Sequence, residues 1–215
     1  MEEISLPKVL LVLAAYLLGS IPTAIWLAKR FYGIDIRQHG SGNAGATNTF
    51  RVLGKKAGIP VLIFDVFKGW LPVFLFVNLS DYDTGSLGYV NFQLILGAAA
   101  LLGHIFPVFA NFKGGKGVAT LLGIVIALHL EASLVSIAIF LVIFLVTRYV
   151  SLGSIISAFT YPILLFLFFR PVPLSLIYFA MIIAIMVLFT HQKNIERLVK
   201  KEENRIKFKK IKHKM

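Results

Sequence analysis

Residues 132–147, ASLVSIAIFLVIFLVT, form an apolar stretch without a charged residue, and this stretch decides the fold class. Its apolar residues follow one another instead of alternating with polar ones, as they would in a strand of a membrane barrel. A segment in lipid must pair its backbone polar groups internally, and a helix does so within itself. We therefore expect residues 132–147 to form a membrane-spanning helix.

The rest of the chain repeats this pattern. Hydrophobic residues make up 58% of the 215 residues and charged residues only 15%, a composition far from that of a soluble domain. Crossing the hydrocarbon takes about 20 apolar residues per helix. Candidate spans lie at residues 6–28, 59–78, 91–109, 118–130, 132–147, 154–169 and 174–190. The sequence predicts an all-α, polytopic membrane bundle of about seven transmembrane helices. The short segment at 118–130 is expected to be tilted or incompletely embedded.

Basic residues predict the orientation of this bundle. From His191 onward the chain carries ten Lys and Arg against three Glu, within a formal net charge of +12. Because positively charged loops stay inside, we expect a cytoplasmic C-terminus and an N-terminus outside, with segments 29–58 and 111–117 on the cytoplasmic side. Residues 1–198 are expected to form a single membrane-embedded domain. Residues 199–215 are expected to form a basic cytoplasmic tail that lies on anionic lipid rather than binding nucleic acid.

The most polar uncharged stretch is HGSGNAGATN at residues 39–48, and Arg51 follows it closely. Its glycines let the backbone bring N–H groups near an anion. Short side chains that can hydrogen-bond to oxygen lie at Ser41, Asn43, Thr47 and Asn48. A flexible loop between two spans needs none of these side chains, so the stretch favours a phosphate or oxyanion site over a plain loop.

A G-x-G-x-x-G pattern at Gly40, Gly42 and Gly45, with Asp65 further on, matches a dinucleotide-binding fingerprint on paper. That fingerprint requires a preceding strand in a parallel βαβ unit. Here the pattern follows an apolar membrane segment with a basic end, so this interpretation is rejected.

Residues 113–117, KGGKG, combine two lysines with glycines just before an apolar segment. Free backbone N–H groups and the positive end of a helix would add to the lysine charges and favour an anion. The stretch is not a P-loop, because Ala110 stands where the first glycine is needed and Gly117 replaces the Ser or Thr that binds Mg²⁺. We expect an anion site here, although topology signalling alone would also explain the lysines.

Polar residues in the spans and at their ends leave alternatives open. Asp65 and Lys68 share a helical face, either as a structural ion pair or as a pair that also positions a ligand. Ser151 is either a helix cap or a hydrogen-bonding partner of a ligand, since no His and Asp lie nearby in sequence to complete a triad. His191 and Asn194 share one face at the end of the last span. The histidine spacings match no metal-binding pattern, so no metal site is expected.

Several motifs occur together along the chain. They are GSIPTA (19–24), HGSGNAGATN (39–48) with Arg51, LGKKAG (53–58), DVFKG (65–69), GHIFPVFANFKGGKGVAT (103–120), RYVSLGS (148–154) and HQKNIERL (191–198). In their order and spacing they resemble the bacterial membrane glycerol-3-phosphate acyltransferases that use acyl phosphate as donor, the PlsY family. The likeness runs from residue 19 to about residue 198, and the long basic extension beyond it is unlike a typical short tail.

The resemblance implies a multi-pass enzyme of the bacterial inner membrane, with seven spans and an active site at the cytoplasmic face. Such an enzyme transfers an acyl chain from acyl phosphate to the 1-hydroxyl of sn-glycerol 3-phosphate, giving lysophosphatidic acid and phosphate in phospholipid synthesis. No cofactor is expected, whether coenzyme A, acyl carrier protein or a metal. The expected partners are the two substrates and membrane lipid, not nucleic acid, and the expected state is a monomer.

The resemblance also implies a role for each matching residue. Catalysis would depend on Ser151, His191 and Asn194. Glycerol 3-phosphate would be bound by Arg51, Lys113, Ser151, His191 and Asn194. Acyl phosphate would be bound by Ser41, Gly42, Asn43, Thr47, Lys68, Gly114, Gly115 and Lys116. The general base is left open between His191 and the substrate's own phosphate. The alternative function is a membrane transporter of a phosphorylated small solute, which would also need anion sites among its helices.

Overall fold

The computed structural model describes residues 5–206, and every regular element among these residues is a helix. The α-helices are α1 (Leu6–Gly19), α2 (Thr23–Tyr32), α3 (Ala46–Leu53), α4 (Lys55–Phe74), α5 (Leu87–Ile105), α6 (Val118–Leu128), α7 (Leu130–Thr147), α8 (Val150–Leu167), α9 (Leu174–Thr190) and α10 (Gln192–Val199). Short 3-10 helices lie at Ile36–Gln38, Phe76–Leu79 and Val108–Ala110. The all-α prediction is confirmed for this part of the chain.

Several helices are suited to a bilayer. Four helical segments are long and apolar enough to cross it, namely Lys55–Leu79, Leu87–Ala110, Leu130–Thr147 and Val150–Leu167. Two bent pairs, α1 with α2 (41°) and α9 with α10 (63°), bring the number to six when each pair counts as one span. The apolar helix α6 is shorter and occupies the short span expected at residues 118–130.

The first span, expected as one helix over residues 6–28, is broken instead. α1 ends at Gly19, and α2 begins at Thr23 with Pro22 directly before it. Proline has no backbone N–H and cannot continue the hydrogen-bond ladder of a preceding helix. The axis therefore bends by 41°, and backbone carbonyls at the break need partners from elsewhere.

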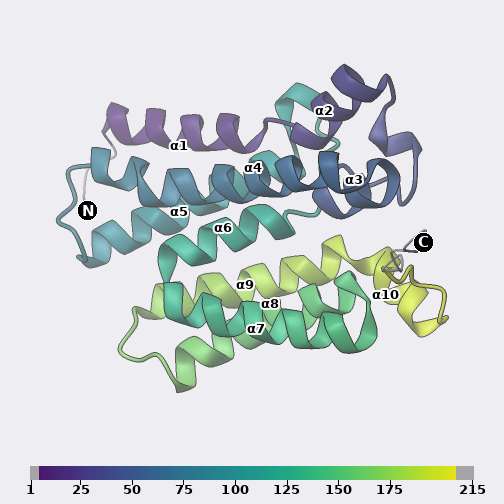
Figure 1. The fold of residues 1–215 in the computed structure, drawn as a ribbon. Helices are drawn as coiled ribbons and strands as arrows, with labels where there is room; N and C mark the ends of the chain where they lie inside the picture. The colour runs from purple at the N-terminus through teal and green to yellow at the C-terminus, as the bar shows by residue number, and fades with distance from the viewer. Residues whose placement is uncertain (1–4, 207–215) are drawn as a thin grey trace, which may run out of the picture.

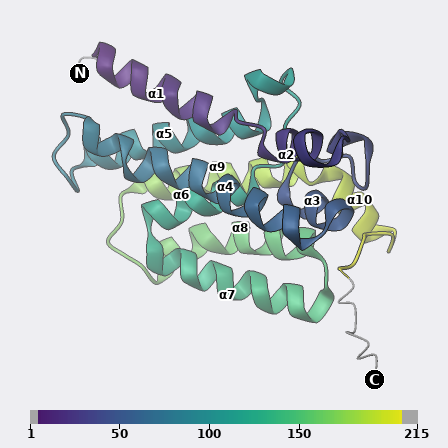
Figure 2. The same cartoon turned by 45° about the horizontal axis from the view of Figure 1, so that its top comes forward.

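The helices bring the polar segments to one end of the bundle. Figure 1 and Figure 2 both place α2, α3 and α10 at the end opposite to the start of α1. α8 packs against both α7 and α9, while α4 packs against α3, α5 and α6. Large apolar side chains stay exposed along the bundle, among them Leu6, Phe31 and Val146. A surface as apolar as this suits lipid rather than water.

Two glycines let α4 and α6 approach each other closely. A Cβ atom at Gly123 would overlap the carbonyl of Val66, and one at Gly69 would overlap the carbonyl of Thr120. These neighbours are backbone atoms, which cannot rotate away as a side chain can. Small residues are enriched where membrane helices cross, for this reason. Because α6 begins directly after KGGKG, the crossing also positions that loop.

We expect Gly123→Ala to lower the Tm of the detergent-solubilised protein by about 5 °C, because overpacking typically costs about 1–3 kcal/mol. Gly153→Ala is the matched control, since its added Cβ would meet mainly the ring of Phe140, a side chain that can rotate. Thermal unfolding of both variants measures the effect. Equal Tm values for the two variants would contradict a rigid backbone contact at Gly123.

Candidate active site

Asn48 organises the polar loop at residues 39–48. Its side chain is 1% exposed, and its Oδ1 accepts from the backbone N–H of Ser41 at 2.8 Å. Its Nδ2 donates to the carbonyls of Ile36 at 3.1 Å and His39 at 2.9 Å. Both hydrogens of the amide are therefore used by backbone carbonyls of the loop and of the segment just before it. Asn48 therefore holds the loop together rather than donating to a bound anion.

The other polar residues of this loop are exposed or half-buried, while Ala44 and Ala46 pack into the core. Ser41 and Gly42 are exposed, while Asn43 and Thr47 are half-buried. Gly42 has a φ of 73°, in the left-handed region that favours glycine, and it turns the chain there. α3 begins at Ala46, so the positive N-terminal end of that helix lies within the same stretch. The loop presents small polar side chains next to this helix end.

The two inner glycines of KGGKG do not offer free amide groups. The N–H of Gly114 donates to the carbonyl of Ile105 at 3.2 Å, and the N–H of Gly115 donates to that of His104 at 3.2 Å. A side chain at either glycine would collide with the end of α5. The expectation of free N–H groups is therefore wrong for these two residues, because the last carbonyls of α5 take them as partners. The flanking lysines still supply positive charge.

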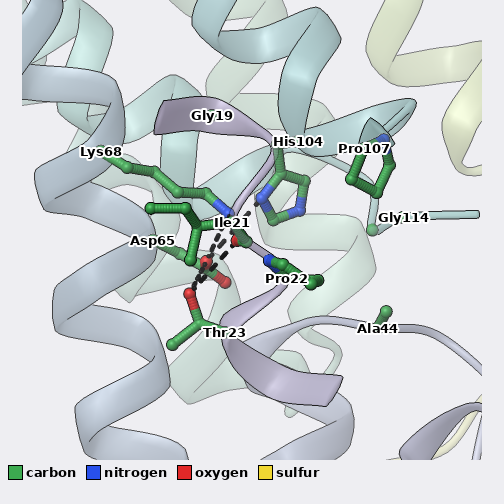
Figure 3. A pocket seen from close by; sticks show the side chains of 11 residues that line it. Gly19, Ile21, Pro22, Thr23, Ala44, Asp65, Lys68, His104, Pro107 and Gly114 are labelled. Carbon is green, nitrogen blue, oxygen red and sulfur yellow. Dashed lines mark hydrogen bonds and ion pairs between the residues drawn. The ribbon is translucent and has the colours of Figure 1, made fainter. Parts of the chain in front are cut away.

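A buried ion pair fills the break between α1 and α2, as Figure 3 shows. The ammonium of Lys68 lies 2.9 Å from Asp65 Oδ1 and donates to the carbonyl of Ile21 at 2.9 Å. Thr23 Oγ1 donates to Asp65 Oδ1 at 3.3 Å. Both charged residues are 1% exposed. The pair ties α4 to the break itself and to the start of α2, and it gives the Ile21 carbonyl a donor.

His104 completes this network from α5. Its Nδ1 lies 3.0 Å from Thr120 Oγ1 and 3.8 Å from Asp65 Oδ1. A cavity of about 10 Å³ lies beside this network and is lined by Lys68 and Gly115. A volume of that order has room for about one water molecule. The structure thus gives Lys68 protein partners, and its binding of acyl phosphate stays a prediction.

A second polar cluster surrounds the carboxylate of Glu203. Asn194 Nδ2 donates to Glu203 Oε1 at 2.6 Å, and Ser151 Oγ donates to the same oxygen at 2.9 Å. Arg197 Nε donates to Glu203 Oε2 at 2.8 Å. The ammonium of Lys116 donates to Asn194 Oδ1. This cluster therefore joins three segments that are far apart in sequence, namely the loop before α6, the start of α8 and helix α10.

His191 lies buried at the junction of α9 and α10. Its Nδ1 is 2.8 Å from the carbonyl of Val187, and a carbonyl only accepts, so Nδ1 carries the hydrogen. The neutral ring therefore keeps Nε2 as an acceptor. Lys116 and Glu203 both act on this ring electrostatically. Nε2 is thus the ring atom left to accept a hydrogen bond or a proton, and the role of His191 as general base stays a prediction.

Positive charge dominates around Glu203. Burial lowers the pKa of Lys116 to about 8, Glu203 opposes this shift, and Arg197 and Arg51 add to it. Burial also lowers the pKa of Arg51, again opposed by Glu203 and reinforced by Arg197. Arg51 of α3 is thus within electrostatic reach of the cluster. Three cationic side chains around one carboxylate form a charge pattern that attracts anions.

Known proteins resemble this chain over most of its length. A family profile described as Glycerol-3-phosphate acyltransferase matches residues 9–201. The chain belongs to the glycerol-3-phosphate acyltransferase family. A member of that name from Fusobacterium nucleatum subsp. nucleatum is 44% identical, with 92% of this chain and 97% of the relative covered. Another from Trichlorobacter lovleyi is 46% identical, with 90% and 94% covered.

Two solved structures of PlsY, an integral membrane glycerol 3-phosphate acyltransferase, share the fold. The glycerol 3-phosphate form has a TM-score of 0.83 at 39% identity, covering 93% of this chain and 96% of PlsY. The lysophosphatidic acid form has a TM-score of 0.80, also at 39% identity, with 93% and 95% covered. The resemblance inferred from the motifs is confirmed, and this acyltransferase family member is a helical membrane protein.

The structure groups the site residues of this acyltransferase family member differently from the sequence. Lys116, predicted with the acyl phosphate set, hydrogen-bonds to Asn194 of the glycerol 3-phosphate set. Lys68, also predicted for acyl phosphate, belongs to the separate network at the helix break. Lys113, the first residue of KGGKG, is exposed. The substrate roles of these residues stay predictions.

Sequence reasoning missed Glu203 and Arg197. Both lie in or next to the segment expected to be a basic tail, and part of that segment folds onto the site instead. The available signal was the pair Glu202 and Glu203 within an otherwise basic run. Residues 207–215, the remainder of the expected tail, lie outside the described residues.

Proposed function

We propose that the protein transfers an acyl chain from acyl phosphate to the 1-hydroxyl of sn-glycerol 3-phosphate, releasing lysophosphatidic acid and phosphate. The observation that carries this is the cationic cluster of Arg51, Lys116 and Arg197 beside Ser151 and Asn194, in a chain of this family. Glycerol 3-phosphate combines a phosphate with hydroxyl groups. The cationic side chains can bind its phosphate through charge-assisted hydrogen bonds, and the serine and asparagine can hydrogen-bond to its hydroxyl groups.

The reaction depends more on how the two substrates are positioned than on a covalent enzyme intermediate. Acyl phosphate is a mixed anhydride with phosphate as a good leaving group, so the enzyme must align two substrates and stabilise oxyanion charge. The 1-hydroxyl oxygen forms a bond to the acyl carbon, and the bond from that carbon to the phosphate oxygen breaks. The hydroxyl proton goes to His191 Nε2 or to a phosphate oxygen. Cationic side chains, with Lys113 among them, would hold the phosphates.

The donor would approach from the bilayer. An apolar groove of about 440 Å³ starts at the helix break and is lined by Trp26, Phe31 and Phe64, with Arg30 among its lining residues. An acyl chain fits such a lining, since burial of each CH₂ stabilises by about 0.8 kcal/mol. The phosphate end would then reach the loop at residues 39–48, where Ser41, Gly42, Asn43 and Thr47 lie near the positive end of α3, and KGGKG beyond it.

We also propose seven spans, with α6 as the short one, an N-terminus outside and a C-terminus in the cytoplasm of a bacterial inner membrane. Charge supports this orientation, because basic residues lie in the segments at residues 29–58 and 111–117, while Asp81 and Asp83 lie in the loop between α4 and α5. The active site would then face the cytoplasm, where glycerol 3-phosphate is available. A monomer contains every site residue named here.

Purified protein in detergent or proteoliposomes should release phosphate from palmitoyl phosphate only when glycerol 3-phosphate is also present, and lysophosphatidic acid should form in equal amount. Mass spectrometry and a phosphate assay measure the two products. Absence of both products would end the acyltransferase proposal. Uptake of labelled glycerol 3-phosphate into proteoliposomes without acylation would instead support the transporter alternative.

A further inference from the structure

Glu203 is a carboxylate at the centre of a site that is built to attract anions. It is 8% exposed and accepts hydrogen bonds from Ser151, Asn194 and Arg197 at 2.6 to 2.9 Å. Two of these three donors are residues predicted to bind glycerol 3-phosphate. Glu202, its neighbour in sequence, is exposed. The contrast between the two acids points to a specific task for Glu203.

Backbone and side-chain contacts hold Glu203 in this place. The N–H of Glu202 donates to the carbonyl of Arg197 at 2.7 Å, and the N–H of Ile206 donates to the carbonyl of Arg148 at 3.1 Å. Arg205 Nε donates to the hydroxyl of Tyr149 at 3.0 Å. The segment is thus tied to α10 just before Glu203 and to the turn between α7 and α8 just after it.

The carboxylate sets the direction of the hydrogen bonds around it. An ionised carboxylate only accepts, so the Ser151 hydroxyl must donate to it and keeps its lone pairs for another donor. For the same reason Asn194 turns its Nδ2 to Glu203 and its Oδ1 to the ammonium of Lys116. Both side chains are thus held in one orientation.

Glu203 also balances the charge of the cluster. Burial opposes its ionisation, but hydrogen bonds from Arg197, Asn194 and Ser151 outweigh burial and lower its pKa. The charged groups that act on Lys116 are Glu203, Arg197 and Arg51, and the ring of His191 also lies within reach. Glu203 is the anion among them, so it favours the protonated form of Lys116.

We propose that Glu203 is a positioning residue of the glycerol 3-phosphate site, which orients Ser151 and Asn194 and balances the positive charge of the cluster. This inference rests on the proposed function, because it assigns a task within that same site. It predicts that loss of the Glu203 charge acts mainly on the use of glycerol 3-phosphate. The use of acyl phosphate is expected to change less, because four of its eight predicted ligands lie in the loop at residues 39–48 and one of them, Lys116, is hydrogen-bonded in this cluster.

The test compares Glu203→Gln with Glu202→Gln in the purified full chain, using palmitoyl phosphate and glycerol 3-phosphate. We expect kcat/KM for glycerol 3-phosphate to fall about 10- to 100-fold in Glu203→Gln only, the range for a lost hydrogen bond to a charged group. KM for palmitoyl phosphate is expected to stay within about threefold. Steady-state kinetics with each substrate varied in turn measure this split.

The pH profile separates positioning from a purely structural role. Lys116 binds an anion while it is protonated, so kcat/KM for glycerol 3-phosphate should fall as pH rises past about 8. Without the Glu203 charge this fall should begin at lower pH, whereas Glu202→Gln should leave it unchanged. Glu203→Asp keeps the charge but shortens the side chain. In this variant kcat/KM should fall at the same pH as in the wild type, whereas KM for glycerol 3-phosphate should still rise.

Each outcome decides between the two proposals. An inactive wild-type protein would reject the proposed function, and the inference about Glu203 would fall with it. An active wild type, with Glu203→Gln matching Glu202→Gln in both kinetics and pH profile, would overturn the inference. Should Glu203→Gln fail to fold, Glu203→Asp decides, and wild-type KM for glycerol 3-phosphate in that variant would equally overturn it.

Discussion

Asp65→Leu should lower the free energy of unfolding by about 3–5 kcal/mol, the usual cost of leaving one partner of a buried ion pair alone. The ammonium of Lys68 would stay 1% exposed without its counter-charge, at the break between α1 and α2. Thermal unfolding in detergent should register this as a decrease of roughly 10 °C in Tm. Thr23 would also lose its hydrogen bond to Asp65 and keep only the longer one to the carbonyl of Ile21, at 3.5 Å.

The double variant Asp65→Leu/Lys68→Met should recover most of this stability, because it removes both charges and keeps an apolar side chain at each position. It also decides between the two interpretations of the pair. If Lys68 only stabilises the helix break, acylation should recover together with Tm. If Lys68 also binds acyl phosphate, Tm should recover while KM for palmitoyl phosphate stays raised. If the stability losses of the two single variants simply add up in the double variant, the two side chains are not coupled, and the ion pair is contradicted.

Arg51→Ala should raise KM for glycerol 3-phosphate about 100-fold, with little change in the amount of folded protein. A charge-assisted contact to phosphate typically contributes about 1.5–3 kcal/mol. Arg51 is partly exposed to solvent and lies within electrostatic reach of Glu203 and Arg197, so its removal should affect the charge of the cluster more than the packing of the core. Initial rates at varied glycerol 3-phosphate measure the effect.

Lys55→Ala is the matched control for Arg51→Ala. Lys55 is an exposed basic residue at the start of α4, close in sequence to Arg51. A general loss of positive surface charge would affect both variants alike. An unchanged KM in Arg51→Ala, or an equal rise in Lys55→Ala, would remove Arg51 from the site. Lys113→Ala should act in the same direction as Arg51→Ala, and unchanged kinetics in both would reject the site assignment.

The fold class and the family could be predicted from the sequence. Hydropathy and segment length are local properties, and stretches such as residues 132–147 can satisfy their backbone in lipid only as helices. The motifs are local too, and their order along the chain identified the family. Residues 132–147 indeed lie within α7, which begins only two residues earlier.

The partners of the polar groups depended on tertiary structure. The sequence offered Gly114 and Gly115 as free N–H groups, but the end of α5 uses both of them. It also offered Lys68 as a ligand of acyl phosphate, yet the broken helix at Ile21 places a carbonyl and Asp65 around that ammonium. Whether a donor is available depends on which acceptor lies opposite, and that acceptor came from another helix.

The sequence by itself determined a helical membrane bundle with polar, glycine-rich segments and the motifs of one enzyme family. Only the tertiary structure decided that Glu203, counted as one acid in a basic tail, lies among Ser151, Asn194 and Arg197. The physical reason is the range of the interactions. Hydropathy and helix formation depend on residues that are close in sequence. A buried charge, in contrast, is stable only where the fold brings hydrogen-bond donors to it from distant segments.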